Sequence, residues 1–332
     1  MDLNGKTILI TGGTGSFGQK FIELVTERYT PKRLIIFSRD ELKQFEMSSR
    51  FPKAKFPFIR YFIGDVRDLE RLRRAFDGVD VLIHAAALKQ VDTCEYNPFE
   101  AVKTNVNGSA NVIDAALDCG VKQVINLSTD KAANPINLYG ATKLCADKMF
   151  VAANNYSGTK DTRFSVVRYG NVVASRGSVV PLFLRQKETG SLTITDPEMT
   201  RFWISLEEAV EFVLTSLGCM RGGEIFVPKI PSVRITDLAQ AIAPECEIKS
   251  IGIRPGEKLH EVMVSRDDAR NTIELDDRFV IHPSDCSQAM KETYANKFGG
   301  KCCSRGFEYS SENNDHWLTV DDLKQMVSGM VI

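Results

Sequence analysis

The feature that most constrains this chain is a glycine-rich turn between an apolar run and a helical pattern. The segment Thr11 to Gly18 follows the run Thr7 to Ile10 and precedes a helical pattern from Gln19 to Arg28. Its glycines allow a tight turn, close approach of the backbone to a pyrophosphate and close helix packing, while the helix N-terminus favours negative charge. Glycine triplets also occur in ordinary turns, but this position favours a dinucleotide site. The expected cofactor contacts are Gly12, Thr14, Gly15, Ser16, Phe17 and Gly18.

Short β-branched runs alternate with longer helical patterns through the first two-thirds of the chain. This alternation is typical of repeated βαβ units and a parallel sheet. Six such runs match a doubly wound sheet, in which ligands bind at the carboxyl ends of the strands. The expected fold is therefore α/β, a doubly wound parallel sheet of the NAD(P)-binding Rossmann type. The expected strands are Thr7 to Ile10, Leu34 to Phe37, Ile59 to Ile63, Val81 to His84, Val124 to Ser128 and Phe164 to Arg168.

The alternation breaks up after about Ser175. Turn-rich stretches at Lys187 to Pro197 and Lys229 to Ser232 interrupt short helical patterns there. We expect residues 1–175 to form an NADP-binding domain, whose core continues in part beyond residue 175, and residues 176–332 to form mainly a smaller substrate-binding lobe. The polar segment from Arg278 to Asn314 shows no clear periodicity, so no element is assigned to it.

Composition narrows the range of partners. The chain of 332 residues has 42 lysines and arginines against 43 aspartates and glutamates, so no overall field attracts nucleic acid or anionic lipid. No apolar run approaches the roughly 20 residues of a membrane span, and the polar start leads directly into a strand, so we expect a cytoplasmic protein. The eight cysteines include no CxxC pair, and the four histidines have no partners at metal-ligand spacing. We therefore expect free thiols and no metal site.

The end of the second expected strand indicates which dinucleotide binds. NAD sites usually place a carboxylate there, whereas NADP sites need a cation for the 2′-phosphate. Ser38 and Arg39 stand at this point, and Lys43 follows one helical turn later, so NADP is the expected cofactor. The alternative is that Arg39 and Lys43 form a solvated helix start that pairs with acidic neighbours. Further expected cofactor contacts after the second, third and fourth strands are Asp40, Asp65, Val66, Ala85, Ala86 and Ala87.

A candidate catalytic group follows the fifth expected strand. Tyr139 and Lys143 are four residues apart and lie on one face of an expected helix, which places both beside the cofactor. A lysine ammonium and the positive nicotinamide ring would lower the tyrosine pKa, so that Tyr139 can remove a hydroxyl proton during hydride transfer. This pair alone has little meaning, because YxxxK is common by chance. Its position after Ser128-Thr129-Asp130-Lys131 favours catalysis over a capping carboxylate and a surface lysine.

Together these motifs resemble the extended short-chain dehydrogenase/reductase family over about residues 5 to 265, and that family implies a Ser/Thr, Tyr, Lys triad. Most sugar-nucleotide 4,6-dehydratases of this family carry Thr, Asp and Glu after strand five, with Asp as acid and Glu as base. This chain has Lys131 in place of the glutamate. The substitution, with Ser38 to Lys43, Asp130 to Pro135, Met199 to Trp203 and the late run Phe307 to Ser311, resembles the inverting UDP-N-acetylglucosamine 4,6-dehydratases, which begin pseudaminic acid biosynthesis in bacteria that glycosylate flagellin.

The resemblance implies a mechanism. Tyr139, supported by Thr129 and Lys143, takes the proton of the sugar 4-hydroxyl while hydride passes to NADP⁺. A neutral Lys131 then removes the proton from carbon 5, and a protonated Asp130 helps the 6-hydroxyl leave as water. Hydride returns to carbon 6, and reprotonation on the opposite face gives UDP-2-acetamido-2,6-dideoxy-β-L-arabino-hexos-4-ulose. The implied contacts to the UDP-sugar are Lys89, Asn171, Arg201, Arg254 and Glu257.

Two alternatives remain at this point. A UDP-sugar 4-epimerase would need no acid and base for elimination, so Asp130 and Lys131 count against it. A non-catalytic NADP-sensing protein would have lost the active tyrosine, and Tyr139 and Lys143 are intact. The family likeness also implies a homo-oligomer, at least a dimer and possibly a hexamer, formed through helices beside the sheet.

Overall fold

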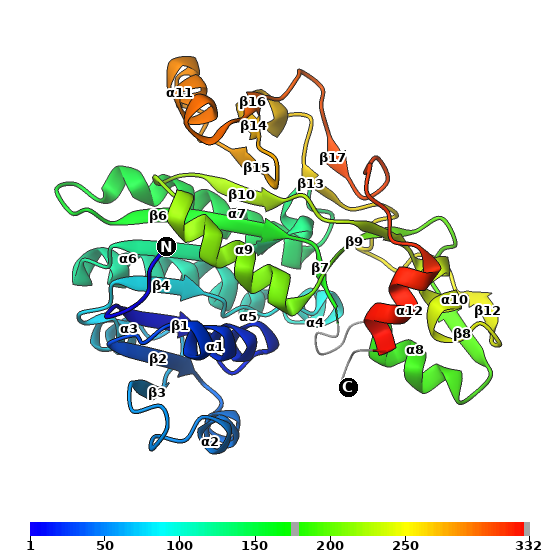
Figure 1. Ribbon diagram of the computed structural model, residues 1–332, viewed down its shortest axis with the longest axis horizontal. Coiled ribbons are helices and arrows are strands. Elements are labelled where there is room, and N and C mark those ends of the chain that lie inside the picture. The colour runs from blue at the N-terminus through cyan, green and yellow to red at the C-terminus, as the bar shows by residue number, and fades with distance from the viewer. Residues whose placement is uncertain (174–178, 329–332) are drawn as a thin grey trace.

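The computed structural model describes residues 1–173 and 179–328. Its main sheet lies at the centre of the molecule and has ten strands, in the order β16-β14-β15-β10-β6-β5-β4-β1-β2-β3 (Figure 1). The strands from β3 to β10 along this order are parallel to one another, and β15, β14 and β16 continue the sheet in antiparallel pairing. The bounds are β1 Thr7–Thr11, β2 Arg33–Ser38, β3 Ile59–Ile63, β4 Val81–His84, β5 Gln123–Thr129, β6 Arg163–Tyr169, β10 Ile225–Pro228, β14 Thr272–Glu274, β15 Arg278–Ile281 and β16 Lys301–Cys302.

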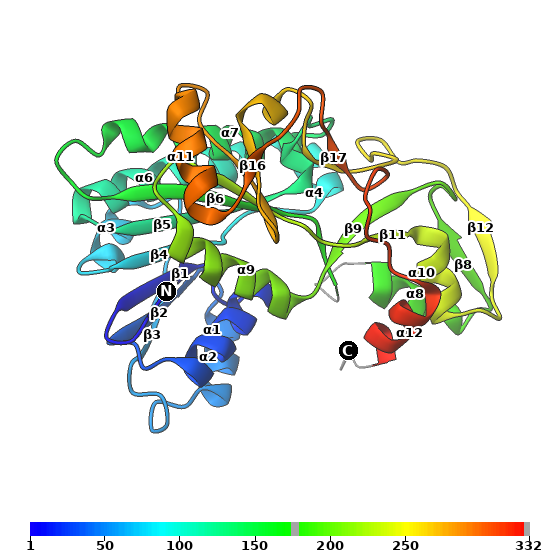
Figure 2. The same ribbon diagram turned by 45° about the horizontal axis from the view of Figure 1, so that its top comes forward.

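The predicted doubly wound sheet is confirmed. All six strands expected from the sequence are present, and none differs from its expected bounds by more than one residue at either end. The central strands are covered on both faces, which explains why they are almost continuously apolar. Helices α1 (Ser16–Arg28) and α9 (Leu206–Cys219) cover one face, and α3 (Leu69–Phe76), α6 (Gly108–Cys119) and α7 (Leu138–Ala152) cover the other (Figures 1 and 2).

The order in which strands are added to the sheet reverses at β1, because β2 and β3 lie on one side of it and β4, β5 and β6 lie on the other. Ligands of open α/β sheets bind in the crevice at such a reversal, beyond the carboxyl ends of the strands. Short helical elements lie in the connections between the strands and the longer helices. They are α2 Glu41–Arg50, α4 Val91–Tyr96, α5 Pro98–Val102, η1 Lys103–Asn107, η2 Asp130–Ala132, η3 Ala153–Tyr156 and η4 Asp268–Asn271.

A second, smaller lobe lies beside the carboxyl edge of the sheet, at the right of Figure 1. It has its own hydrophobic cluster, which includes Phe183, Leu192, Leu238 and Leu323. Its elements are α8 Val179–Lys187, β8 Ser191–Ile194, α10 Ile235–Ile242, β12 Glu247–Ser250 and α12 Val320–Ser328. Two small sheets lie between this lobe and the main sheet. They contain β7 Asn171–Val172, β9 Thr200–Ile204 and β11 Ser232–Arg234, and β13 Val262–Val264 with β17 Tyr309–Ser310.

The structure adds elements that periodicity did not show. The expected turn-rich stretch at Lys187 to Pro197 contains β8, which pairs with β12. The unassigned segment from Arg278 to Asn314 contains β15, β16, β17 and the helix α11 (Gln288–Phe298). These strands are only two to four residues long and are formed by distant pairing partners, so little of their signal is local. The expected domain boundary at about Ser175 lies outside the described residues.

Within residues 1–173 and 179–328, no helix is long and apolar enough to cross a lipid bilayer. The same residues contain no group of three or more histidine, cysteine, aspartate or glutamate side chains that could hold a metal ion.

Candidate active site

A cavity of about 990 Å³ opens at the carboxyl edge of the parallel strands and extends to residues of the smaller lobe. Every residue predicted to contact the cofactor or the substrate lines it, as do four of the five predicted catalytic residues. The fifth, Asp130, is fully buried behind the cavity wall. The lining residues predicted from the sequence are Gly12, Thr14, Gly15, Ser16, Phe17, Gly18, Ser38, Arg39, Asp40, Lys43, Asp65, Val66, Ala85, Ala86, Ala87, Lys89, Thr129, Lys131, Tyr139, Lys143, Asn171, Arg201, Arg254 and Glu257.

The glycine-rich turn between β1 and α1 forms one end of the cavity. Gly12 has a φ of 65°, a left-handed conformation that favours glycine. A Cβ at Gly12 would lie 2.9 Å from the backbone of Ala86 at the end of β4, so any other residue would also clash there. The turn thus leaves room for a ligand to approach the backbone at the N-terminus of α1. These features fit the pyrophosphate of a dinucleotide.

The end of β2 presents polar and cationic groups to the same cavity. The Ser38 hydroxyl lies 2.7 Å from that of Thr14, and the side chain of Arg39 is 52% exposed. Arg39 contacts Asp65 at 3.4 Å, whereas Lys43 pairs with Asp40, which also caps the N-terminus of α2. Lys43 therefore makes the pairing expected of a solvated helix start, while Arg39 turns toward the end of β3.

Asp65, at the end of β3, is an ionised group in this region. Burial on its own would raise the pKa of Asp65, but hydrogen bonds from Arg67 and the charge of Arg39 hold the pKa below its ordinary value. The carboxylate therefore keeps Arg39 close to the cavity wall. An incoming phosphate would compete with Asp65 for the Arg39 guanidinium.

The end of β4 is organised by Thr11. Its hydroxyl accepts hydrogen bonds from the backbone N–H groups of Ala85 and Ala86 and lies 2.8 Å from Nδ1 of His84. His84 is buried and stacks on Phe150, and burial lowers its pKa to about 3. It is therefore a neutral core residue, not a group of the cavity.

Tyr139 and Lys143 lie in the first two turns of α7 and both line the cavity. Burial lowers the pKa of Lys143, and the charge of Asp147 opposes this effect. The expected lowering of the Tyr139 pKa included the positive nicotinamide ring of the cofactor, and the protein alone has the opposite effect. Burial raises the pKa of Tyr139 to about 12, although the charge of Lys131 and a hydrogen bond to Thr129 act in the opposite direction. Within the protein, Lys131 is thus one cation that favours ionisation of Tyr139.

Helix α7 packs tightly against the η2 turn, which carries the other catalytic candidates. Asn137 caps the helix, and its Oδ1 accepts a hydrogen bond from the backbone N–H of Gly140 at 2.8 Å. A Cβ at Gly140 would lie 2.1 Å from the carbonyl oxygen of Lys131. Glycine is therefore required for this approach, which sets the separation between Tyr139 and Lys131.

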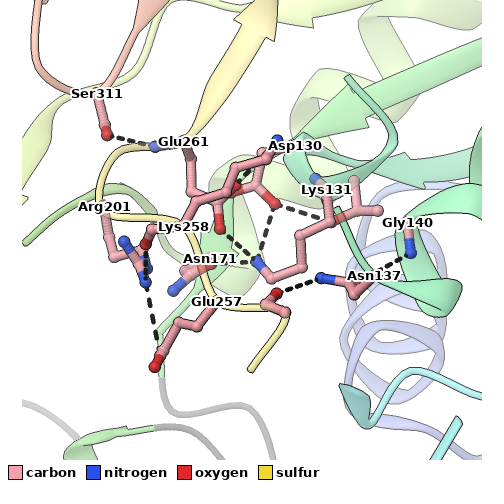
Figure 3. Close-up of polar contacts among 12 residues, drawn as sticks. Asp130, Lys131, Asn137, Gly140, Asn171, Arg201, Glu257, Lys258, Glu261 and Ser311 are labelled. Carbon is pink, nitrogen blue, oxygen red and sulfur yellow. Dashed lines mark hydrogen bonds and ion pairs between the residues drawn. The ribbon is translucent and has the colours of Figure 1, made fainter. Parts of the chain in front are cut away.

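Lys131 lies between two carboxylates (Figure 3). Its Nζ is 3.1 Å from Oδ1 of Asp130 and 3.2 Å from Oε1 of Glu261, and it donates to Oδ1 of Asn171 at 3.4 Å. Asp130 also accepts a hydrogen bond from the Thr129 hydroxyl at 2.9 Å.

The expectation that Lys131 is held neutral is wrong for this arrangement. Burial on its own would lower the pKa of Lys131, but the charges of Asp130 and Glu261 outweigh burial and raise the pKa above its ordinary value. The reason is that a buried charge is destabilised only when it lacks partners, and Lys131 has two anionic ones. Lys131 is therefore an ammonium ion in the protein.

The predicted substrate contacts differ in how they are held. Arg201 is 4% exposed, and its guanidinium donates to the carbonyl oxygens of Thr200, Lys258 and Leu259 and lies 3.6 Å from Glu257. Arg254 is exposed and forms an ion pair with the same Glu257 at 3.2 Å. Glu257 thus joins a rigid and an exposed arginine at one side of the cavity. Lys89 is an exposed residue that also lines the cavity.

Sequence reasoning missed several residues of the cavity. The most important is Glu261, which is 1% exposed and directly precedes β13. In the sequence, Glu261 stands next to the apolar run Val262–Val264, which indicates a buried carboxylate. The sequence does not show that Lys131 forms the ion pair with it. The other missed lining residues include Tyr169, Val172, Arg185, Thr195, Met199 and Trp203.

Comparisons with known proteins give a consistent family. A family model described as "Polysaccharide biosynthesis protein" matches residues 8–283. A protein of Campylobacter jejuni subsp. jejuni serotype O:23/36 (strain 81-176), named UDP-N-acetylglucosamine 4,6-dehydratase (inverting), is 56% identical over 330 residues and is matched over 98% of both chains. A protein of Rickettsia canadensis (strain McKiel), named UDP-glucose 4-epimerase, is 41% identical over 97% of this chain and 95% of its own.

A solved structure extends these comparisons to three dimensions. The X-ray structure of Pen from Bacillus thuringiensis has a TM-score of 0.88 and 36% sequence identity, and the match covers 99% of this chain and 98% of that one. The similarity therefore includes the smaller lobe as well as the main sheet.

Proposed function

This chain belongs to the polysaccharide biosynthesis protein family, and from that membership and its site we propose that it is an inverting UDP-N-acetylglucosamine 4,6-dehydratase. The product is UDP-2-acetamido-2,6-dideoxy-β-L-arabino-hexos-4-ulose, which supplies pseudaminic acid biosynthesis and flagellin glycosylation. The observation that carries the proposal is the contact between Asp130 and Lys131 at the cavity that Tyr139 also lines. Elimination of water needs such an acid and base, whereas epimerisation at carbon 4 does not.

NADP is the proposed cofactor. When bound, it supplies reversible hydride transfer, by which carbon 4 is oxidised and carbon 6 is later reduced. The turn at Gly12 and the N-terminus of α1 would hold the pyrophosphate, and Ser38, Arg39 and Lys43 would hold the 2′-phosphate. The exposed guanidinium of Arg39 supports this assignment, because it is free to turn from Asp65 toward a stronger anion.

Tyr139 is the proposed base of the oxidation. Its phenolate takes the proton of the 4-hydroxyl, and the ammonium groups of Lys131 and Lys143 stabilise the phenolate. The 4-ketone then makes the proton at carbon 5 acidic. Since Tyr139 has a raised pKa in the protein, its ionisation depends on these positive charges when substrate is present.

Asp130 and Lys131 share one proton across a 3.1 Å contact. Transfer of that proton from Nζ of Lys131 to Asp130 converts an ion pair into a carboxylic acid and a free amine. The amine then takes the proton from carbon 5, the electron pair forms the carbon 5–carbon 6 double bond, and Asp130 gives its proton to the departing 6-hydroxyl. Both groups return to the ion pair in which they began.

The substrate is proposed to lie between the cofactor and the smaller lobe. Arg201 and Arg254 would bind the diphosphate, with Glu257 orienting both guanidinium groups. Lys89 and Asn171, which also line the cavity, would contact the sugar.

Cytoplasmic location and self-association are also proposed. The partly open apolar hollow on α6 and α7 supports a homo-oligomer formed through these helices. Its lining includes Ile113, Leu117, Met149 and Tyr156, the last of which is 71% exposed. Light scattering of the purified protein would measure its mass directly, and a monomer at working concentrations would contradict this part of the proposal.

The decisive experiment is incubation of the purified protein with UDP-N-acetylglucosamine in D₂O, followed by NMR of the early products. The L-arabino-configured 4-keto sugar should form with deuterium at carbon 5, and no net reduced nicotinamide should accumulate. A D-xylo product would contradict inversion only, and a 4-epimer that keeps its 6-hydroxyl would establish an epimerase. Absence of turnover would favour the non-catalytic alternative. Tyr139→Phe should block the first oxidation.

A further inference from the structure

Glu261 is a buried carboxylate at the site to which neither the acid nor the base role has been given. Its side chain is 2% exposed and lies beside Lys131, although the two residues are far apart in the sequence (Figure 3). Burial of a carboxylate costs several kcal/mol unless it is paired, so its position requires a compensating charge. Lys131 at 3.2 Å and Lys258 at 3.9 Å provide that charge.

The backbone around Glu261 is held by the C-terminal segment. The N–H of Glu261 donates to Oγ of Ser311 at 2.9 Å, and the N–H of Ser311 donates to the carbonyl oxygen of Glu261 at 2.8 Å. The hydroxyl groups of Ser311 and Thr200 are 2.7 Å apart, which connects this link to β9. Glu261 is thus fixed from both sides and cannot withdraw easily from Lys131.

We propose that Glu261 is a positioning residue of the dehydration, whose charge retains on Lys131 the single proton that Lys131 and Asp130 share. This inference rests on the proposed function of that pair. If Lys131, whose side chain is 23% exposed, lost its proton to solvent, it would be a free amine but Asp130 would remain a carboxylate. The site would then have a base and no acid, and water could not leave from carbon 6.

The charges around Lys131 favour this role for Glu261. Asp130 must give up its negative charge when it becomes the acid, so it cannot hold the proton through the whole cycle. Glu261 keeps its charge and remains as the permanent anion. The other charged or titratable groups that face the cluster are Tyr139 from α7, Arg168 from β6, Arg201 from β9 and Lys258 from the loop before β13. Arg201 and Lys258 are cations that oppose proton retention on Lys131, so a second carboxylate favours it.

The test compares Glu261→Gln with the wild-type holoenzyme over a range of pH. Glutamine preserves the shape and the acceptor oxygen but removes the charge. The loss of activity at alkaline pH, where the shared proton leaves, should move to lower pH by about 1 to 3 units, because an opposite charge at this distance has been removed. If the role of Glu261 were purely structural, Glu261→Gln would lower activity equally at every pH. The pH at which activity is lost on the alkaline side would then not change, which would overturn the proposal.

A second measurement does not depend on turnover. Acetic anhydride modifies free amines, so mass spectrometry of Lys131 labelling against pH follows the same proton. Labelling should begin at lower pH in Glu261→Gln than in wild type, and coincident labelling curves would also overturn the proposal. Glu224→Gln is a matched control, since Glu224 is likewise 1% exposed, accepts a hydrogen bond from Ser165 and does not line the cavity. It should leave both pH curves unchanged.

Two further controls keep the result interpretable. If Glu261→Gln does not fold, Glu261→Asp retains the charge at a longer distance and should move both curves in the same direction by a smaller amount. No shift in that variant would overturn the inference. Wild-type protein that makes no 4-keto sugar would contradict the proposed function instead, and the labelling curves would still decide whether Glu261 holds the proton.

Discussion

Arg39 is the residue proposed to distinguish NADP from NAD, two cofactors that differ by a single phosphate. Its guanidinium is exposed at the cavity wall and is held near the end of β3 by Asp65. We predict that Arg39→Ala weakens NADP binding by about 1.5 to 3 kcal/mol, the range for a hydrogen bond to a charged group, and leaves NAD binding nearly unchanged. Calorimetric titration of both cofactors measures this difference. Equal weakening of the two would contradict the assignment of NADP.

In the proposed mechanism, Lys131 is the residue that permits inversion at carbon 5. A carboxylate base can take and return the carbon 5 proton on one face, whereas a lysine that works with a donor on the other face permits inversion. We predict that Lys131→Ala abolishes elimination but retains the cofactor, because the turn at Gly12 is untouched. Oxidation by Tyr139 should be slowed, since Lys131 favours its ionisation, but reduced nicotinamide should still build up after substrate is added.

The measurement for Lys131→Ala is a single-turnover absorbance trace with NMR of the products. Formation of the 6-deoxy sugar at a near-normal rate would mean that another group is the base. Lys258→Met is an informative comparison, because Lys258 lies 3.9 Å from Glu261 and donates its hydrogen bond to the carbonyl oxygen of Ala133. It should retain elimination.

At the scale of elements, the approach of α7 to the η2 turn determines the geometry of the site. Gly140 leaves no space for a side chain, since a Cβ there would overlap the carbonyl oxygen of Lys131. Gly140→Ala should therefore push the helix away from the turn and destabilise the protein by about 1 to 3 kcal/mol, the usual cost of overpacking. It should also lower kcat much more than it raises KM, because Tyr139 and Lys131 are on the two separated elements.

Gly218→Ala provides a matched control for the helix. Gly218 is also a helical glycine, in α9, but the nearest atom to an added Cβ is 3.6 Å away. Alanine should stabilise this helix by roughly 0.5 to 1 kcal/mol and leave kcat unchanged. Chemical denaturation and steady-state kinetics of both variants test the comparison, and equal activity in the two would show that the α7 contact does not matter for catalysis.

At the scale of the whole molecule, the hydrophobic core contains a neutral histidine, His84. The pKa of His84 is about 3 in the folded protein and about 6.5 when unfolded. Between these values the unfolded chain binds a proton that the folded protein does not, so stability falls as pH decreases from 6.5 toward 3. At pH 5 this linkage costs about 2 kcal/mol. His282, whose pKa burial lowers to about 4, adds a loss of the same sign.

We therefore predict that the free energy of unfolding is smaller at pH 5 than at pH 7.5. His84→Gln should remove the part of this difference that protonation of His84 causes. Denaturant titrations at the two pH values measure the free energy of unfolding of each variant. The exposed His316 supplies the control variant, His316→Gln, which should keep the full pH dependence. If His84→Gln retained the wild-type difference between the two pH values, His84 would not be the linked group.

The sequence by itself determined the six parallel strands, the glycine turn and the places of Tyr139, Asp130 and Lys131, because each signal is local. Apolar runs specify buried strands, a glycine triplet specifies a turn, and residues just after a strand lie at its carboxyl end. The later elements carry weaker local signals, since β15, β16 and β17 are short and form only when distant partners pair with them.

Only the tertiary structure decided the charge on Lys131. Its ionisation depends on Glu261, which is far away in the sequence and reaches the site through β13 and Ser311. The expectation of a neutral lysine considered burial alone, and burial does favour the neutral amine. A second buried carboxylate reverses that preference, because electrostatic energies depend on the distance between charges in space and not on their separation along the chain.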